Sequence, residues 1–347
     1  MSGMKEGASM IKREIYLKRI RPFYGSEMVK VITGIRRCGK STIMRQIIEE
    51  IQENGVEEDH IIYINFEDYK YRKICNPDAL YGYVEENIRD NQKYYLFFDE
   101  IQNVDEFELV INSFRATHDA SIFITGSNSK LLSGELATHL SGRTLSFKVL
   151  PFNFQEFCEL KKSEGDNRTY DEYMQEFLNC ASLSDSGQSV SAPTVYDYLK
   201  FIADACVCDK VPRYDIRGKK ALAFEEKTYV CDLGFFHLKK NRVKDEYNYM
   251  METLCYNELV SRGYQVYVGK TYKGEIDFIA TRGDEKIYVQ AAYLLTDEAV
   301  VEREFGAYRV VQDNYPKYVI SMDKIVSSRE GIIHMNVIDF CLNGFKG

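Results

Sequence analysis

The chain has 347 residues, 45% of them hydrophobic and 28% charged, with a net charge of −8. A chain of this length can form two or three domains and bury a core in each. Its negative charge argues against a protein covered with nucleic-acid-binding surface. A local basic patch is still compatible with the run Lys12, Arg13, Lys18, Arg19 and Arg21. The alternative is that these side chains form the solvated face of a helix.

No hydrophobic stretch approaches the roughly 20 residues that span a bilayer, and no apolar segment near the start resembles a secretory signal. The nine cysteines are scattered without a C-x-x-C pair, which favours a reducing, cytoplasmic setting. The five histidines are far apart in the sequence and suggest no zinc site. We therefore expect a cytoplasmic protein without a membrane segment.

The first 150 residues alternate between short β-branched or aromatic runs and stretches with helical spacing. Strands are expected at 29–33, 61–66, 94–98, 121–125 and 144–150, and helices at 41–52, 78–88 and 107–114. Strands separated by helices predict an α/β domain with a mostly parallel sheet covered on both faces. Ligands bind such sheets beyond the carboxyl ends of the strands. Polar motifs that follow these strands should therefore lie together at one edge.

Residues 34–41 read GIRRCGKS and match the phosphate-binding pattern G-x-x-x-x-G-K-[ST] between an expected strand and an expected helix. The glycines allow backbone N–H groups to point at phosphates, and the start of the helix adds its positive dipole end. Lys40 would reach the β- and γ-phosphates, and the Ser41 hydroxyl would ligate Mg²⁺. The alternative is a chance match in a turn. The predicted ATP-binding residues are Gly34, Ile35, Arg36, Arg37, Cys38, Gly39, Lys40, Ser41 and Thr42.

The run YYLFFDEIQ at 94–102 is an apolar strand that ends in two carboxylates. Asp99 would hold the magnesium ion through water, and Glu100 would act as a base on the attacking water. An acidic pair at the end of a strand can also cap a helix. Its place some 60 residues after the phosphate-binding loop favours a nucleotide site. The two motifs together predict an ATPase that uses ATP and Mg²⁺.

Two weaker features fit the same site. In the run SIFITGSNS, Ser127 or Asn128 could sense the γ-phosphate, although Ser127 could also cap a helix. Arg143 stands just before the last expected strand. It could complete the site of a neighbouring subunit as an arginine finger, which contributes about 10³–10⁵ in rate, or it could be a surface turn residue.

Two arginines occupy loop positions where small residues are usual. Arg36 and Arg37 could pair with phosphates or with acidic groups of a neighbour. Glu67 and Asp68 end the second expected strand at the same edge. One of these two acids is therefore a candidate partner for one of the arginines.

Four segments, in this order, carry a resemblance to a known family: GIRRCGKST, LFFDEIQ, ITGSNSKLL and SGRTLSFKVLPFNFQEF. The chain resembles a large prokaryotic family of predicted AAA+ ATPases. The C-terminal part of that family is a domain of unknown function that resembles PD-(D/E)XK restriction endonucleases. The resemblance extends over nearly the whole chain through PTVYDYL, KTYVCDLG and GEIDF. It implies the roles given above for the loop and the acidic pair. It also makes Asn128 a sensor candidate and Arg143 a finger that acts in trans within a homo-oligomer.

The middle of the chain is expected to be helical at 152–165 and 171–181, with a Ser- and Gly-rich linker at 182–191. A helix over 191–202 is followed by an alternating, partly basic stretch that predicts a pair of strands. A helix and a hairpin form the second half of a winged-helix unit, which could read DNA. The alternative is a packing helix in the lid of the ATPase. Compared with the family, the chain is shortened between about 177 and 191.

The last part of the chain is expected to form a helix, a hairpin, a helix and a strand. The resemblance asks for a glutamate on the first helix, an aspartate on the first hairpin strand and a Glu-x-Lys pair on the second. In such nucleases the acids bind Mg²⁺ and the lysine helps to activate water. Glu258 and Asp277 fit the first two places. Gln290 and Ala292 stand where the glutamate and the lysine of the pair are expected, so Lys286 would have to replace the lysine. We expect a nuclease-like fold with a degenerate site.

The sequence thus predicts three domains. They are an AAA+ ATPase core at 1–150, a helical lid with a partial winged-helix region at 151–225 and an α+β, restriction-endonuclease-like domain at 226–347. The leading hypothesis is Mg²⁺-dependent hydrolysis of ATP to ADP and phosphate, driving a conformational change in an oligomer. One alternative is an ATP-regulated protein that acts on DNA, such as a nuclease, repair or defence factor. Another is a nucleotide-controlled binding switch with little turnover and an unknown protein partner.

Overall fold

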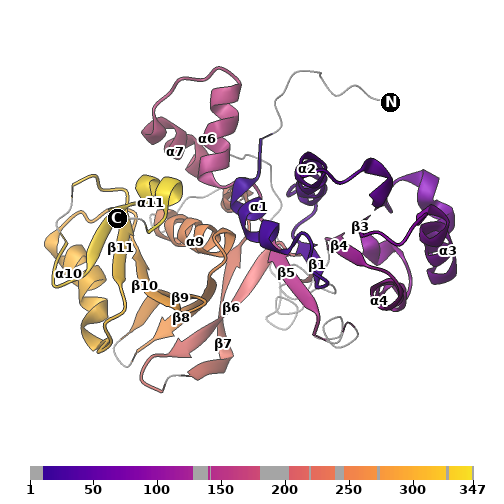
Figure 1. Ribbon diagram of the computed structural model, residues 1–347. Coiled ribbons are helices and arrows are strands. Elements are labelled where there is room, and N and C mark those ends of the chain that lie inside the picture. Colours follow the sequence, from indigo (N-terminus) through magenta and orange to yellow (C-terminus); the bar gives the residue numbers. More distant parts are fainter. Residues whose placement is uncertain are drawn as a thin grey trace. The chain divides into compact units, whose positions relative to one another are not determined.

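The computed structural model describes residues 11–127, 140, 142–179, 203–218, 220–238, 246–271, 274–325 and 328–345. It has two compact units (Figure 1). The N-terminal unit is built from Lys12–Pro151, and the C-terminal unit takes in Cys208–Gly347 together with the helices that follow Phe152. Within the described residues, no helix combines the length and the apolar character needed to cross a membrane. The eight cysteines that the structure describes are all free thiols.

A five-stranded parallel sheet forms the centre of the N-terminal unit, with the strand order β2-β3-β4-β1-β5. Its strands are β1 (Val29–Thr33), β2 (Ile61–Asn65), β3 (Tyr94–Asp99), β4 (Ala120–Gly126) and β5 (Thr144–Lys148). Each lies within two residues of its expected bounds. The predicted α/β class with a parallel sheet is therefore confirmed.

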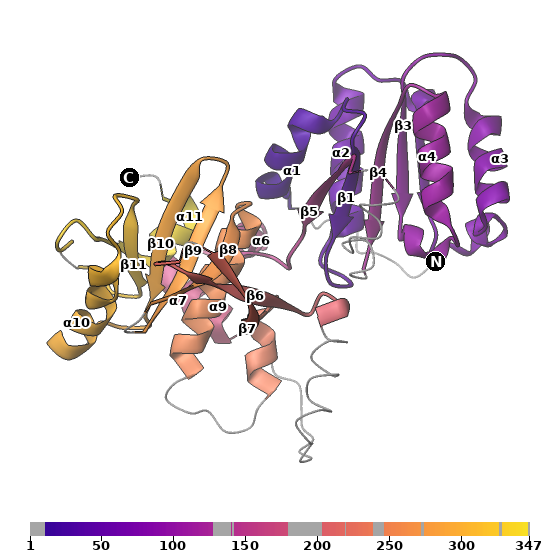
Figure 2. The same cartoon turned by 90° about the horizontal axis from the view of Figure 1, so that it is seen from below.

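Helices cover both faces of this sheet (Figure 2). They are α1 (Glu14–Ile20), α2 (Lys40–Glu53), α3 (Pro77–Asn87) and α4 (Phe107–Thr117), with 3₁₀ turns at Arg21–Phe23, Glu58–His60, Tyr69–Ile74 and Ile101–Asn103. Since successive side chains of a strand point to opposite faces, Phe97 of β3 packs in the core with α1 and α2, and Phe98 packs with α3 and α4. The ring of Phe97 stacks on that of Phe123 in β4 at 4.5 Å.

A seven-stranded mixed sheet forms the C-terminal unit, with the order β12-β11-β10-β9-β8-β6-β7. Its strands are β6 (Cys208–Asp215), β7 (Lys220–Val230), β8 (Gln265–Lys270), β9 (Glu275–Arg282), β10 (Glu285–Ala291), β11 (Lys317–Ser321) and β12 (Ile333–Asn336). The pairs β6–β7, β8–β9 and β9–β10 are antiparallel, and the other three are parallel. The expected helix, hairpin, helix and strand are present within this arrangement.

Helices lie on both faces of the mixed sheet as well. They are α6 (Phe154–Ser163), α7 (Tyr170–Asn179), α9 (Glu246–Ser261), α10 (Glu298–Gly306) and α11 (Val337–Asn343), with 3₁₀ turns at Leu233–Leu238 and Ala307–Val310. On one face Phe154, Leu254 and Phe340 share a core with the strands. On the other face Phe305 of α10 packs against Tyr288 of β10. The unit is therefore three layers thick.

The structure divides the middle of the chain differently from the expectation. The β6–β7 hairpin is present, but β6 also pairs with β8, so both strands belong to the C-terminal sheet. The boundary expected at 225–226 falls inside β7. Helices α6 and α7, expected as a lid on the nucleotide site, contribute to the C-terminal core instead. The expected helix over 191–202 lies outside the described residues. The described part of 151–225 is thus not a domain of its own.

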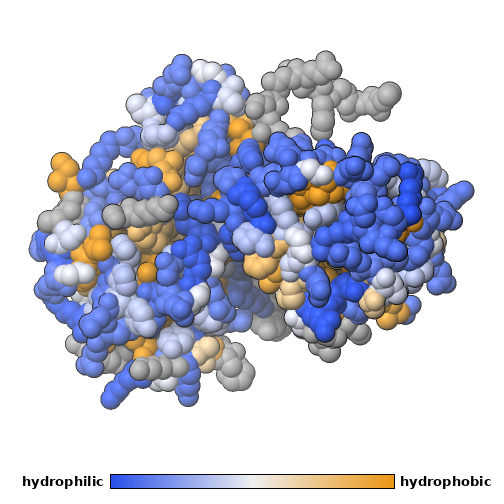
Figure 3. Space-filling view, in the orientation of Figure 1, coloured by the Kyte–Doolittle hydropathy of each residue, from blue (hydrophilic) through white to orange (hydrophobic). Residues whose placement is uncertain are grey.

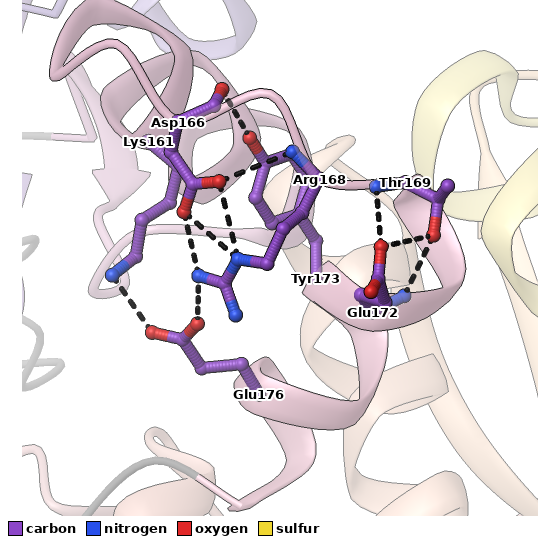
Figure 4. A network of polar contacts seen from close by, with 7 residues as sticks. All are labelled: Lys161, Asp166, Arg168, Thr169, Glu172, Tyr173 and Glu176. Carbon is purple, nitrogen blue, oxygen red and sulfur yellow. Dashed lines mark hydrogen bonds and ion pairs between the residues drawn. The ribbon is translucent and has the colours of Figure 1, made fainter.

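The turn between α6 and α7 is held by a network of polar contacts (Figure 4). Arg168 pairs with Asp166 and Glu176, and Lys161 reaches the same Glu176 at 2.7 Å. The hydroxyl of Tyr173 donates to the carbonyl oxygen of Asp166 at 2.7 Å, while its ring is buried in the C-terminal core. The network fixes the two helices to each other, and their apolar sides secure them to the C-terminal unit.

The surface is mainly hydrophilic on the face seen in Figure 3, with hydrophobic side chains in small, separate patches. The large hydrophobic side chains with the greatest exposure are Tyr69, Leu109 and Ile325. They come from different elements of the chain. Scattered exposure of this kind is normal for folded proteins.

Candidate functional site

The loop between β1 and α2 requires glycine at two positions. Gly34 and Gly39 have φ values of 154° and 97°. A Cβ atom at Gly34 would lie 2.1 Å from the carbonyl oxygen of Val149, and one at Gly39 would lie 2.9 Å from the guanidinium of Arg13. Helix α2 begins at Lys40, so the predicted ATP-binding residues 34–42 form this loop and the first turn of the helix. The unpaired N–H groups of that turn are therefore at the loop.

Lys40 and Glu100 meet at the carboxyl edge of the parallel sheet. The Nζ atom of Lys40 lies 3.2 Å from Oε1 of Glu100 and donates to the carbonyl oxygen of Gly34 at 3.1 Å. The other carboxylate oxygen of Glu100 accepts hydrogen bonds from Gln102 at 2.5 Å and Ser127 at 3.1 Å. Burial raises the pKa of Glu100, but Gln102, Lys40 and Ser127 together outweigh it, so the pKa lies below its ordinary value. Glu100 is therefore ionised at neutral pH.

Asp99 is fully buried at the end of β3 and is held from both neighbouring strands. Its Oδ2 atom accepts a hydrogen bond from Tyr63 of β2 at 2.8 Å, and its Oδ1 atom accepts one from Thr125 of β4 at 2.5 Å. The Thr125 oxygen also accepts the backbone N–H of Glu100 at 2.9 Å. Burial and the Asp99 carboxylate raise the pKa of Tyr63, so its hydroxyl stays a donor. Tyr63 is not part of the sequence motifs, and Thr125 stands in ITGSNSKLL without a role that the sequence assigned to it.

The arginine–acid pairing expected at this edge is present for one acid. Arg36 contacts Glu67 at 2.9 Å, although both side chains are at least half exposed. Exposed pairs of this kind contribute little stability. Asp68 instead caps the 3₁₀ turn Tyr69–Ile74 by accepting the N–H of Lys70. The structure thus joins the phosphate-binding loop to the end of β2 through Glu67.

Of the expected sensor and finger residues, Ser127 lies at this site, where it contacts Glu100 at 3.1 Å. Asn128 lies outside the described residues. Arg143 stands at the start of β5, where its carbonyl oxygen accepts the N–H of Val29 at 3.0 Å. The loop follows the other end of the five-residue strand β1, which spans roughly 15 Å at about 3.3 Å per residue. Arg143 is therefore at the opposite edge of the sheet from its own Lys40.

The basic run near the start of the chain is largely paired or buried. Lys12 and Arg21 contact Glu50 at 2.9 and 2.8 Å. Arg13 is only 1% exposed. The other two basic residues of the run, Lys18 and Arg19, lie in the last turn of α1.

A cavity of about 600 Å³ in the C-terminal unit contains part of the expected nuclease-like site. Its lining includes Glu252 of α9, Asp277 of β9 and Gln290 of β10. The backbone N–H of Asp277 donates to Oε1 of Gln290 at 3.3 Å, and its Oδ2 atom accepts the N–H of Ala291 at 2.9 Å. Burial and the nearby Glu252 charge raise the pKa of Asp277 well above its ordinary value. Lys227 of β7 pairs with Glu252.

Glu258, the glutamate expected beside Asp277, does not line this cavity, whereas Glu252 does. At 3.6 residues per turn, six residues along α9 rotate a side chain by about 240° relative to Glu252. Glu258 is 1% exposed and pairs with Arg262 at 2.6 Å. Burial raises its pKa to about 7 although Arg262 opposes the shift. Lys286 pairs with Asp313 and does not replace the missing lysine.

The donor atoms of the N-terminal site fit a magnesium ion that binds together with a nucleotide. Within the parts of the chain that the structure describes, no group of three or more His, Cys, Asp or Glu side chains is arranged to hold one. At the N-terminal site a carboxylate at Asp99 and a hydroxyl at Ser41 provide oxygen ligands, which Mg²⁺ prefers, and nucleotide phosphates usually complete its shell. That donor set fits magnesium bound together with a nucleotide.

The comparison with protein families decides the nature of the N-terminal unit. Residues 26–158 match the family model of the AAA domain. This segment is an AAA domain. It contains β1 to β5, the phosphate-binding loop and the acidic pair, so the AAA+ assignment is confirmed for this part of the chain. The resemblance of the C-terminal part to restriction endonucleases stays a prediction.

Two relatives match almost the whole chain. An uncharacterized protein of Haemophilus influenzae is 29% identical over 399 residues, covering 96% of this chain and 99% of its own length. One from Methanocaldococcus jannaschii is 27% identical over 409 residues, with 96% and 88% covered. Since this chain has 347 residues, both alignments include residues of the relatives that have no counterpart here.

The similarity to solved structures is lower. Cdc6p from Pyrobaculum aerophilum gives a TM-score of 0.34 at 11% identity, covering 47% of this chain and 52% of that one. A DNA replication initiation factor gives 0.33 at 13% identity, covering 54% and 58%. The match thus spans little more than half of each of these solved chains.

Proposed function

We propose that the AAA domain binds ATP with Mg²⁺ and hydrolyses it to ADP and phosphate. The observation that supports this most directly is the 3.2 Å contact between Lys40 and Glu100. The two residues come from different motifs and meet at the edge of the sheet where α/β proteins bind ligands. A lysine that neutralises phosphate charge thus lies beside a carboxylate that can orient and deprotonate water.

Each remaining group has a defined task in this proposal. The loop backbone and the start of α2 bind the phosphates. Ser41 and Asp99 would hold the magnesium ion, which supplies charge neutralisation on the β- and γ-phosphates. Tyr63 and Thr125 keep the Asp99 carboxylate in one orientation. Glu100, ionised and held by Gln102 and Ser127, receives the proton of the attacking water.

Arg143 completes the site of a neighbouring copy in this proposal. Because it lies at the opposite edge of the sheet from its own Lys40, it can act as a finger only in trans. Such an arginine stabilises the charge that develops on the transferred phosphoryl group. The active form is then a homo-oligomer in which each AAA domain contributes to the next site, and hydrolysis changes how the copies contact one another.

Steady-state ATP hydrolysis across a range of protein concentrations tests this function, with the natural protein beside Glu100→Gln and Arg143→Ala. Turnover per subunit should rise with concentration and fall at least about 100-fold in Glu100→Gln, the usual size for a lost general base. Arg143→Ala should lose the concentration dependence. Tight ATP binding with turnover no faster than that of Glu100→Gln would replace hydrolysis with a nucleotide-controlled binding switch.

A second candidate function rests on the C-terminal cavity. The structure groups Glu252, Asp277 and Gln290 around it and adds Lys227, which pairs with Glu252 from β7. Acids with a nearby lysine are the groups with which metal-dependent nucleases activate water, and here the lysine comes from outside the expected pair. Nicking of supercoiled plasmid in Mg²⁺ or Mn²⁺ should be abolished by Asp277→Ala and retained by Glu258→Gln. Nicking that persists in Asp277→Ala would remove this candidate.

A further inference from the structure

Arg13 lies directly behind the phosphate-binding loop although no nucleotide-site motif includes it. One guanidinium nitrogen, Nη1, donates to the carbonyl oxygen of Cys38 at 2.6 Å. The other, Nη2, donates to the carbonyl oxygen of Leu150 at 2.9 Å. The backbone N–H of Arg13 donates to the side chain of Gln46 in α2 at 3.0 Å. A single buried side chain thus joins the loop to the segment that leaves β5.

The contact with Cys38 sets the direction of one peptide group in the loop. In a planar trans peptide, the C=O of Cys38 and the N–H of Gly39 point in opposite directions. Arg13 holds the carbonyl oxygen, so the N–H of Gly39 points away from Arg13. A peptide turned over at this place would instead present its carbonyl oxygen to the bound phosphate, which repels it.

We propose that Arg13 is a positioning residue for phosphate binding, which presets the peptide between Cys38 and Gly39 so that its N–H faces the phosphate. This inference rests on the proposed nucleotide-binding function. Presetting the loop lowers the cost of ordering it when the nucleotide arrives. Arginine suits the task because its planar fork donates to two carbonyl groups at once, whereas a lysine amine is a single point of charge.

Helix α1 provides a matched control for this role. The hydroxyl of Tyr16 accepts the N–H of Leu150 at 3.1 Å, so Arg13 and Tyr16 bind the two backbone groups of the same residue. Tyr16 is as deeply buried as Arg13, and its ring lies 4.8 Å from the guanidinium. Tyr16→Phe removes one bond to Leu150 and leaves the contact with Cys38. Arg13→Met removes the hydrogen bonds of the guanidinium to Cys38, Leu150 and Pro151.

The test is the dissociation constant of ADP for the full-length natural protein, Arg13→Met, Arg13→Lys and Tyr16→Phe. Each also needs its unfolding midpoint without nucleotide and its KM and kcat for ATP. Arg13→Met should weaken ADP binding about ten-fold or more, the size expected for a hydrogen bond from a charged group. Its KM should rise while kcat at saturating ATP is retained, because Arg13 touches no reacting atom. Tyr16→Phe should lower the unfolding midpoint and bind ADP like the natural protein.

Two results would overturn the inference. One is equal ADP affinity of the natural protein and Arg13→Met. The other is equal weakening in Arg13→Met and Tyr16→Phe, since the docking of α1 and not the contact with Cys38 would then control binding. If Arg13→Met does not fold, the ADP affinity of Arg13→Lys is compared with those of the natural protein and Tyr16→Phe instead. This variant keeps the buried charge but loses the planar guanidinium. A natural protein that binds no nucleotide would reject the proposed function itself.

Discussion

The two acidic sites of this protein differ in what surrounds their carboxylates. In the AAA domain, Glu100 faces Lys40 and accepts hydrogen bonds from Gln102 and Ser127, so its pKa is lowered in spite of burial. In the C-terminal cavity, burial and the Glu252 charge raise the pKa of Asp277 well above its ordinary value. The first site is therefore built to keep a negative charge without a ligand. The second favours a neutral carboxyl group, because burial and the Glu252 charge outweigh the nearby Lys227.

This difference has a structural origin. Parallel strands bring the ends of β3 and β4 to the start of α2, so donors from three segments meet one carboxylate. In the mixed sheet, Asp277 lies inside the hairpin strand β9 and receives one backbone N–H, while its neighbour across the cavity is another acid. Hydrogen bonds and opposite charge favour the ionised form, and desolvation with like charge opposes it.

The largest expected effect follows from removing the cation of the first site. Lys40→Met should weaken ATP binding by about 100-fold, because in the proposed function the lysine pairs directly with phosphate and such charged hydrogen bonds are among the strongest. The measurement is nucleotide affinity by calorimetry. Lys30→Met is the matched control: Lys30 is buried in β1 and contacts Ser121 at 2.7 Å, and no acidic side chain among the described residues pairs with it. Its loss should lower stability and leave affinity unchanged, and a similar loss of affinity in both variants would contradict the assignment.

The next effect concerns a buried acid in the C-terminal unit. Burial raises the pKa of Glu258 from 4.5 to about 7. Between these values the folded state binds more protons than the unfolded state, so the free energy of unfolding falls as the pH rises. Glu258→Gln has no such titration. Its stability relative to the natural protein should improve from pH 4.5 to pH 7 by up to about 3 kcal/mol, since one pKa unit corresponds to about 1.4 kcal/mol.

Denaturant unfolding at several pH values measures this difference. The control is Glu298→Gln, because the exposed Glu298 pairs with Arg329, which lowers its pKa. Its contribution to stability is present above the ordinary pKa and is lost as the pH falls through the lowered one. The two variants should therefore shift the pH profile in opposite directions. Parallel profiles for the natural protein and Glu258→Gln would show that Glu258 is not titrating in this range.

The parts of the fold that are encoded locally could be predicted from the sequence. The strands of the AAA domain are continuous apolar runs, and the loop has a glycine pattern with a fixed meaning, so both were found within a few residues. Tyr63, Thr125 and Arg13 were missed because their roles come from neighbours that are distant in the sequence. Tyr63 touches Asp99 only because β2 lies beside β3 in the sheet.

In the C-terminal unit, too, the expectations differ from the structure where contacts between distant residues decide. Buried apolar side chains lie on most sides of α9, among them Met250, Cys255, Leu259 and Tyr256, so no polar face indicates which of its acids points to the cavity. We expected Glu258 from its position along the helix. Whether an acid of α9 reaches the cavity depends instead on the direction in which its side chain points around the helix axis. The β6–β7 hairpin is visible in the sequence, but its pairing with β8 brings together residues more than 50 positions apart.

The smallest expected effect tests whether the hydrogen bonds around Asp99 matter for its proposed task. Tyr63→Phe removes the 2.8 Å hydrogen bond to Oδ2 and keeps the ring. The carboxylate then loses one of its two side-chain donors and should hold magnesium less well, so about ten-fold more Mg²⁺ should be needed for half-maximal ATP hydrolysis. Tyr71→Phe is the control, because its hydroxyl donates to the backbone of Tyr63 at 3.3 Å and does not contact Asp99. A higher Mg²⁺ requirement in Tyr63→Phe alone would show that the first site depends on the donors that position its charge. Equal requirements would mean that the buried carboxylate is held well enough by Thr125, and the contrast with the C-terminal cavity would then rest on Lys40 and Glu100.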